Sequence, residues 1–281
     1  MFRIASLTKA FTAVATLRAT AAAGVDLNTP VLEALPQVRD VWRAHPRITI
    51  EQLLAQTSGL ASTVEGSDVA AFGDGDDAAM ATARMVAQHG SSRSPGERWE
   101  YYNGNYFVAG AITAQLTGRS YEQALTDLVL TPFGLNNTSF EATAALVEGT
   151  VGGRPVWEAG YPRGRRPSGG LISTLDDLLS FASQLLADAR LAQVIGRSRT
   201  RPTDPMRYGL GWAIGPSGQM YVNGRLPGYR SALLGLPDQG MVVCGLAADQ
   251  HALPQLAACL NDIQLGITGD DLADAIDRFA A

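Results

Sequence analysis

Lysine is almost absent from this sequence of 281 residues: Lys9 is the only lysine among the 22 Lys and Arg residues. Cysteine is also scarce, and neither Cys244 nor Cys259 belongs to a C-x-x-C pair, which argues against a metal site. The net charge of −5 provides no basic surface for nucleic acid. No apolar run reaches the roughly 18 residues of a membrane span, so we expect no membrane helix.

The start of the chain does not look like a signal peptide. Thr, Arg and Lys interrupt the small apolar residues of segment 1–24. As written, the chain is therefore expected in the cytoplasm; a shortened form of a longer protein would instead be periplasmic or extracellular. Both cysteines lie in apolar segments and are interpreted as small core residues.

Hydrophobic periodicity separates a mostly helical part from a part rich in strands. Helices are predicted over residues 6–23, 49–59, 78–90, 107–118, 120–134, 173–188, 253–265 and 269–281, and loops over 61–77 and 141–170. Short apolar runs at 208–214, 219–224, 229–237 and 241–248 predict three or four antiparallel strands. The expected fold class is α+β, or a mixed α/β layer domain that carries a helical insertion. We expect a sheet-plus-helix domain of residues 1–24 and 206–281 and a mostly helical domain of residues 25–205, with any active site between them.

The single lysine lies three residues after a serine, in the segment "IASLTKAFTA". On a helix, Ser6 and Lys9 share one face, so their side chains meet. Burial would lower the pKa of Lys9, and a neutral amine can accept the Ser6 proton and make the serine a nucleophile. Arginine keeps its proton in proteins, which explains why this position is not arginine.

Two further segments carry polar groups suited to catalysis. In "YYNGNY", Tyr101 supplies a phenol that we expect to lose its proton more easily beside a lysine ammonium. Asn103 supplies an amide that we expect to hold a substrate carbonyl and the lysine together. In "VNGRLPGY", Gly224 lets a substrate approach the strand, and the N–H of Arg225 would form an oxyanion hole with that of Ser6. Each segment alone is also typical of an ordinary turn.

Together these segments resemble the serine β-lactamase and penicillin-binding protein superfamily, and most of all its class C β-lactamase and β-lactamase-like esterase branch. "SLTK" is similar to the S-x-x-K motif, "LLAQTSGL" to the family's LLxHTSGL with Gln56 in the usual His place, and "YYN" to Y-x-N. "SGGLISTLDDLLSFASQLL" and "YGLGW" are similar as well. The resemblance implies an antiparallel sheet flanked by helices, as in the β-lactamase/transpeptidase fold.

The resemblance also implies roles for individual residues. Ser6 would be the acylated nucleophile, Lys9 and Tyr101 the base pair, and Asn103, together with Asn223, Gly224 and Arg225, the substrate-binding group. The implied reaction is acyl transfer through an acyl-enzyme on a small ester, amide or β-lactam, with no metal and no organic cofactor.

The sequence departs from the family pattern in two places. The third motif reads Val222-Asn223-Gly224, so the usual Lys or His is missing, which favours neutral esters or amides unless Arg225 or Arg230 replaces the charge. Only five residues precede Ser6, so we expect a sheet without the family's N-terminal strands. The last predicted helix or a second subunit would cover the face of the sheet that the missing strands leave exposed. A homo-oligomer is therefore one of the expected possibilities.

Two alternatives remain at this level. A Ser-His-Asp hydrolase is disfavoured because no G-x-S-x-G occurs and the three histidines lie outside every motif. A catalytically weak or inactive penicillin-binding-like module, which would bind or regulate, is compatible with Val222 and the short N-terminus.

Overall fold

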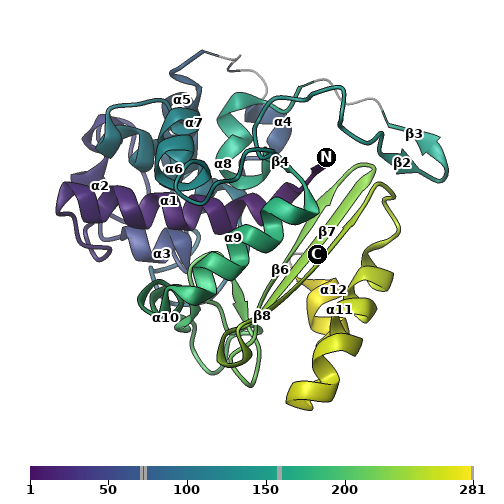
Figure 1. The fold of residues 1–281 in the computed structure, drawn as a ribbon. Coiled ribbons are helices and arrows are strands. Elements are labelled where there is room, and N and C mark those ends of the chain that lie inside the picture. Colours follow the sequence, from purple (N-terminus) through teal and green to yellow (C-terminus); the bar gives the residue numbers. More distant parts are fainter. Residues whose placement is uncertain (70–71, 73–74, 157–159, 280–281) are drawn as a thin grey trace.

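The computed structural model describes residues 1–69, 72, 75–156 and 160–279. Parts of the predicted loops (70–71, 73–74 and 157–159) and the last two residues of the final predicted helix lie outside this description. Figure 1 shows helices gathered on one side of an antiparallel sheet, with two more helices on the sheet's other side. The arrangement confirms the α+β class, whereas the division into two domains stays a prediction.

Helix α1 (Thr8–Ala23) runs through the centre of the protein (Figure 1). A short 3-10 turn, η1 (Ala5–Leu7), precedes it, and Gly24 ends it in the left-handed conformation at φ 66°. Small and apolar residues surround the helix on nearly every side, so it packs closely against α6 and α8. The predicted helix is confirmed, except that α1 begins two residues after Ser6 and no side chain caps it.

The main sheet consists of four antiparallel strands in the order β5-β6-β7-β8. Its strands are β5 (Ala213–Ile214), β6 (Met220–Leu226), β7 (Tyr229–Leu236) and β8 (Met241–Ala247). Each corresponds to one of the predicted apolar runs. The register places Gly224 opposite Ser231 and Arg225 opposite Arg230.

Two short strand pairs lie outside this sheet. The strand β1 (Phe2–Arg3) pairs with β4 (Ile172–Ser173), and β2 (Thr150–Val151) pairs with β3 (Arg154–Pro155). The first pair attaches the start of the chain, just before Ser6, to the segment that follows α8. The turn η1 itself packs against β6 and β7, so the sheet supports the start of α1.

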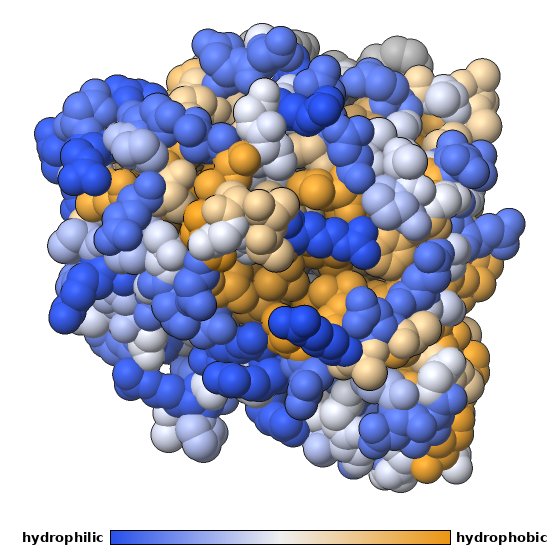
Figure 2. Space-filling view, turned by 60° about the vertical axis from the view of Figure 1, so that its left-hand side comes forward, coloured by the Kyte–Doolittle hydropathy of each residue, from blue (hydrophilic) through white to orange (hydrophobic). Residues whose placement is uncertain are grey.

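The remaining helices are α2 (Val31–Ala34), α3 (Ile50–Leu54), α4 (Gly66–Val69), α5 (Ala78–Gln88), α6 (Asn103–Thr117), α7 (Tyr121–Leu125), α8 (Arg166–Gly169), α9 (Leu175–Ala187), α10 (Ala189–Gly196), α11 (Leu253–Thr268) and α12 (Ala273–Arg278). Helix α9 covers one face of the sheet, and α11 and α12 cover the other (Figure 1). One hydrophobic core lies between the sheet and its helices, and a second lies among α2, α3, α5 and α6. Figure 2 shows hydrophobic side chains gathered in a hollow near the middle of one face, between hydrophilic groups.

Four predictions needed correction. The helix expected over residues 49–59 is confirmed at its start by a Thr49–Gln52 capping box, but it ends at Leu54 because Gln56 adopts φ 60°. The predicted loop 61–77 contains α4, and the predicted loop 141–170 contains β2, β3 and α8. Cys259 is exposed on α11 rather than a core residue, and both cysteines are free.

Candidate active site

Ser6 lies in a tight turn that the sequence pattern does not reveal. The preceding residue, Ala5, has φ 47°, a left-handed conformation that costs a non-glycine residue about 1–2 kcal/mol. Gly224 on β6 approaches this turn closely, because a Cβ on Gly224 would collide with the Ile4 carbonyl and Ser231 Oγ. Strained backbone of this kind is typical of functional sites. The turn leaves the Ser6 side chain partly exposed while its neighbours are buried.

Lys9 is fully buried one helical turn after Ser6. Its Nζ lies 3.1 Å from Ser6 Oγ and donates to the main-chain oxygen of Ser168 at 2.8 Å. The Tyr101 and Tyr106 rings flank the amine, with centroids 4.8 and 5.6 Å from Nζ. The S-x-x-K spacing therefore brings the two side chains together, as predicted.

Burial sets the protonation state of Lys9. It lowers the pKa of the amine well below its ordinary value, and the positive charge of Arg165 lowers it further. Among the described residues, no carboxylate contributes to this shift. The amine is thus suited to accept a proton from Ser6.

Tyr101 reaches the same serine from the other side of the site. Its hydroxyl donates to Ser6 Oγ at 2.7 Å. The expectation that this phenol loses its proton easily is wrong in direction: burial raises the pKa of Tyr101, and this outweighs its hydrogen bond to Ser6 and the charge of Arg225. The physical reason is that burial disfavours the charged phenolate.

Gln56 holds the backbone on both sides of Tyr101. Its main-chain oxygen accepts from the Glu100 N–H at 2.9 Å, and its Oε1 accepts from the Tyr102 N–H at 3.1 Å and from Asn105 Nδ2 at 2.6 Å. The left-handed backbone of Gln56 aims the side chain at this loop. Sequence reasoning noted Gln56 only as a departure from the family pattern, and it overlooked Asn105, the second asparagine of "YYNGNY".

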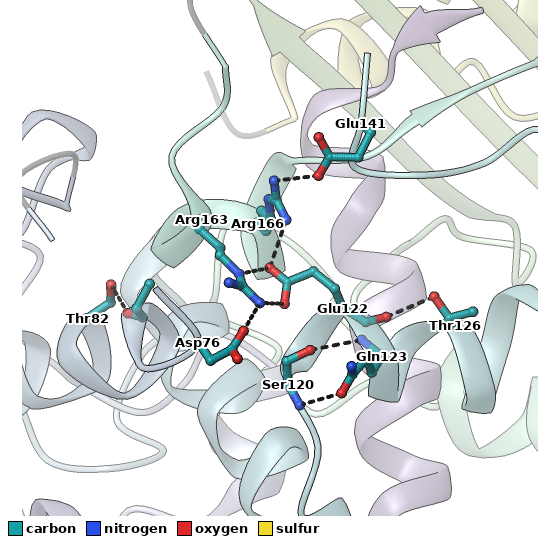
Figure 3. A network of polar contacts seen from close by, with 10 residues as sticks. Asp76, Thr82, Ser120, Glu122, Gln123, Thr126, Glu141, Arg163 and Arg166 are labelled. Carbon is teal, nitrogen blue, oxygen red and sulfur yellow. Dashed lines mark hydrogen bonds and ion pairs between the residues drawn. The ribbon is translucent and has the colours of Figure 1, made fainter. Parts of the chain in front are cut away.

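The carbonyl that holds Lys9 belongs to α8, which an ion-pair network fixes in place (Figure 3). At the centre of the network, Glu122 on α7 binds Arg163 at 2.9 Å and Arg166 at 3.0 Å. Burial alone would raise the pKa of Glu122, but the hydrogen bond from Arg163 and the charges of both arginines hold it below its ordinary value. The outer ends of these arginines bind Asp76 and Glu141.

The predicted substrate-binding residues occupy different surroundings. Asn103 is exposed at the start of α6, and no side-chain hydrogen bond of Asn103 occurs within the part of the chain that the structure describes. Asn223 is buried and donates to the Ile276 and Asp277 carbonyls, and the Arg225 guanidinium also donates to Asp277.

The structure also shows the surroundings of Val222, which takes the place of the usual Lys or His in the third motif, and of Arg230, the candidate replacement for that charge. Val222 is fully buried. Arg230 donates to the Leu226 and Tyr229 carbonyls of its own hairpin, so its charge lies at the end of β6 and β7.

In residues 1–69, 72, 75–156 and 160–279, no helix combines the length and apolar character needed to cross a bilayer.

Comparison with known proteins identifies the family of this arrangement. The family model Beta-lactamase matches residues 1–264. Protein flp of Staphylococcus aureus (strain MW2) is 28% identical over 289 residues, which cover 92% of this chain and 55% of that protein. The chain therefore spans about half the length of this curated relative.

Solved structures share the fold over most of the chain. A D-stereospecific amidohydrolase from Streptomyces sp. has a TM-score of 0.74 at 24% identity, covering 95% of this chain and 86% of its own. EstCE1, described as a hydrolase with promiscuous acyltransferase activity, has a TM-score of 0.72 at 19% identity, covering 89% and 80%. The resemblance inferred from the sequence motifs is confirmed.

Proposed function

The chain belongs to the beta-lactamase family, and from that premise we propose that it is a serine hydrolase that transfers acyl groups through a covalent intermediate on Ser6. One observation carries the proposal: Ser6 Oγ lies 3.1 Å from the buried Lys9 amine and 2.7 Å from the Tyr101 hydroxyl. A serine between a proton acceptor and a proton donor is arranged for nucleophilic attack followed by protonation of a leaving group.

In the proposed acylation step, Ser6 Oγ attacks the substrate carbonyl carbon while neutral Lys9 takes the hydroxyl proton. The N–H groups of Ser6 and Arg225 are the proposed donors to the oxyanion; the close approach of Gly224 to the Ser6 turn supports this assignment. As the tetrahedral intermediate collapses, the bond to the leaving group breaks. Tyr101 gives the leaving group a proton, and the lysine ammonium restores it.

In the proposed deacylation step, water takes the place of Ser6 as the nucleophile, and Lys9 is again the base. A water molecule attacks the ester carbonyl of the acyl-enzyme and transfers its proton to the neutral Lys9 amine. The bond to Ser6 Oγ breaks, and the lysine ammonium returns the proton to Ser6 Oγ as the carboxylic acid leaves. All proton transfers in these steps take place between the substrate, water, Ser6, Lys9 and Tyr101.

The proposed substrates are small neutral esters or amides, with β-lactams as the weaker option. Two structural neighbours are described as an amidohydrolase and as a hydrolase with acyltransferase activity, which supports acyl-transfer chemistry. The buried Val222 in the third motif leaves that position without a charge for a substrate carboxylate. Asn103 is proposed to contact the substrate carbonyl from the exposed start of α6.

Mass spectrometry after incubation with 4-nitrophenyl acetate and with a fluorescent penicillin tests the proposal. The expected result is an acyl adduct on Ser6 and turnover of the ester, both absent in Ser6→Ala. Ser92→Ala, at an exposed serine, serves as the matched control and should keep both. No adduct and no turnover in the wild-type protein would reject the enzyme and favour a binding or regulatory module.

A further inference from the structure

The C-terminal segment of the protein folds back toward the candidate active site. Gly269 takes φ 77° at the end of α11, and the chain then reverses into α12. We call residues 269–279 the C-terminal tail. Leu272, Ile276 and Phe279 of this tail are buried in the core between the sheet and its helices. The tail is therefore part of the folded protein rather than a loose end.

Phe279, at the end of the described tail, is fully buried among three tyrosines. Its ring is nearly parallel to that of Tyr208, at 9° and 6.0 Å between centroids. It meets the Tyr101 ring edge-on at 5.9 Å and the Tyr221 ring at 6.3 Å. Both geometries are favourable for aromatic pairs. Because the Tyr101 hydroxyl donates to Ser6 Oγ, Phe279 lies one side chain away from the proposed nucleophile.

Polar groups of β6 hold the tail in this position. Asn223 Nδ2 donates to the carbonyls of Ile276 and Asp277, and the guanidinium of Arg225 donates to Asp277 as well. Strand β6 is the same strand whose Gly224 contacts the Ser6 turn. The tail thus uses its main-chain carbonyls to satisfy two side-chain donors of β6.

A cavity of about 1000 Å³ adjoins this arrangement. Its apolar lining includes Trp99, Tyr101, Met206, Tyr221 and Leu272. Two of these residues, Tyr101 and Tyr221, also contact Phe279. The cavity and the Phe279 ring therefore border the same two side chains, and one of them, Tyr101, also binds Ser6.

We propose that Tyr101, Tyr208 and Tyr221 form a subsite for an aromatic group of the substrate, and that Phe279 occupies this subsite as an intramolecular competitor. The inference rests on the proposed hydrolase function and adds the substrate class, an ester or amide that carries a phenyl-sized group. A tethered competitor acts at a high effective concentration, so the tail would reduce the apparent affinity for such substrates.

Kinetics on two esters with one leaving group test the subsite. For 4-nitrophenyl phenylacetate, Phe279→Ala is expected to raise kcat/KM at least tenfold, while for 4-nitrophenyl acetate it changes less than threefold. Phe140→Ala is the matched control, because this partly buried ring contacts Tyr121 and lies outside the tail. It should leave kcat/KM unchanged for both esters. An equal rise for both esters, or no rise for the phenylacetate, would overturn the subsite.

A binding measurement separates this inference from the proposed function. In a Ser6→Ala background, calorimetry should give a Kd for phenylacetamide at least tenfold lower when Phe279→Ala is added, and acetamide should show no such gain. Tighter phenylacetamide binding in the Phe279→Ala variant, without ester turnover by the wild type, would support the subsite and reject the hydrolase function. Ester turnover without tighter phenylacetamide binding would support the hydrolase function and reject the subsite. Phe279→Leu, which keeps apolar volume, replaces Phe279→Ala in both experiments if the alanine variant unfolds.

Discussion

Lys9 Nζ donates to the main-chain carbonyl of Ser168 at 2.8 Å, and both groups are buried. The bond joins residues 159 positions apart, one on the central helix and one on α8. It holds the amine beside Ser6 without giving it a negative partner, which is the condition for a lysine that stays neutral. The residues of this site and those that position them lead to five testable predictions.

Replacing Lys9 should stabilise the protein while abolishing activity. The pKa of Lys9 is lower in the folded than in the unfolded chain, so the unfolded chain binds more protons between these two values and stability rises with pH there. Lys9→Met loses this slope and should be more stable at pH 7 by about 2 kcal/mol. Urea unfolding at pH 7 and pH 10 measures the difference, which should shrink at the higher pH. Arg39→Met, at an exposed arginine, is the control; a destabilised Lys9→Met at pH 7 would contradict the account.

Activity should depend on pH through the same amine. Since Lys9 acts when neutral, kcat/KM for 4-nitrophenyl acetate should fall as pH decreases through the lowered pKa of Lys9. The raised pKa of Tyr101 predicts no loss from phenol ionisation below about pH 10. Lys9→Arg should lower kcat by roughly 100- to 10,000-fold at every pH. Retention of full activity in Lys9→Arg would refute the base role.

Gln56 should act as a positioning residue for Tyr101. Gln56→Ala frees the backbone on one side of the tyrosine and should lower kcat by about 10- to 100-fold with little change in KM. Gln255→Ala, at an exposed glutamine of α11, is the matched control. If Gln56 works through Tyr101, adding Gln56→Ala to Tyr101→Phe should cause little further loss of kcat. A fully additive loss would indicate a merely structural role.

The Glu122 network should contribute to stability above acidic pH. Glu122→Gln removes the charge that Arg163 and Arg166 share and should cost about 1–3 kcal/mol at pH 7. The pKa of Glu122 is lower in the folded protein, so the advantage of the wild type is present above the unfolded value of 4.5 and disappears as pH falls through the folded value. Asp127→Asn, in an exposed pair with Arg119, should cost less than about 0.5 kcal/mol. Equal losses in the two variants would show that the network adds nothing to an ordinary surface pair.

Gly224 should tolerate no side chain. Gly224→Ala places a methyl group against the Ile4 carbonyl and Ser231 Oγ, which should cost about 1–3 kcal/mol and displace the Ser6 turn. Thermal unfolding and kcat measure the two effects. Gly235→Ala on the neighbouring strand is the control, because its nearest neighbour is a flexible Leu186 side-chain atom at 3.2 Å. An active, stable Gly224→Ala would show that this close approach is not needed.

The sequence by itself determined much of the local structure. The Ser6–Lys9 spacing, the stop at Gly24, the Thr49 cap and the four strand segments are set by interactions between residues near one another in the chain. Such interactions depend on side-chain type and helical or strand period, both of which can be read from the letters. The motifs also specified the family, because several independent segments occur in the right order.

Only the tertiary structure decided the chemistry of the site. The lowered pKa of Lys9 depends on burial and on the charge of Arg165, and the raised pKa of Tyr101 depends on burial. The sequence predicted the first shift only on the condition that Lys9 is buried, and it did not predict the second. The side chains of Asn223 and Arg225 bind the C-terminal tail that brings Phe279 to Tyr101, a contact that the sequence did not reveal. Desolvation and long-range contact arise only when distant segments pack together, and they determine which of the available groups can react.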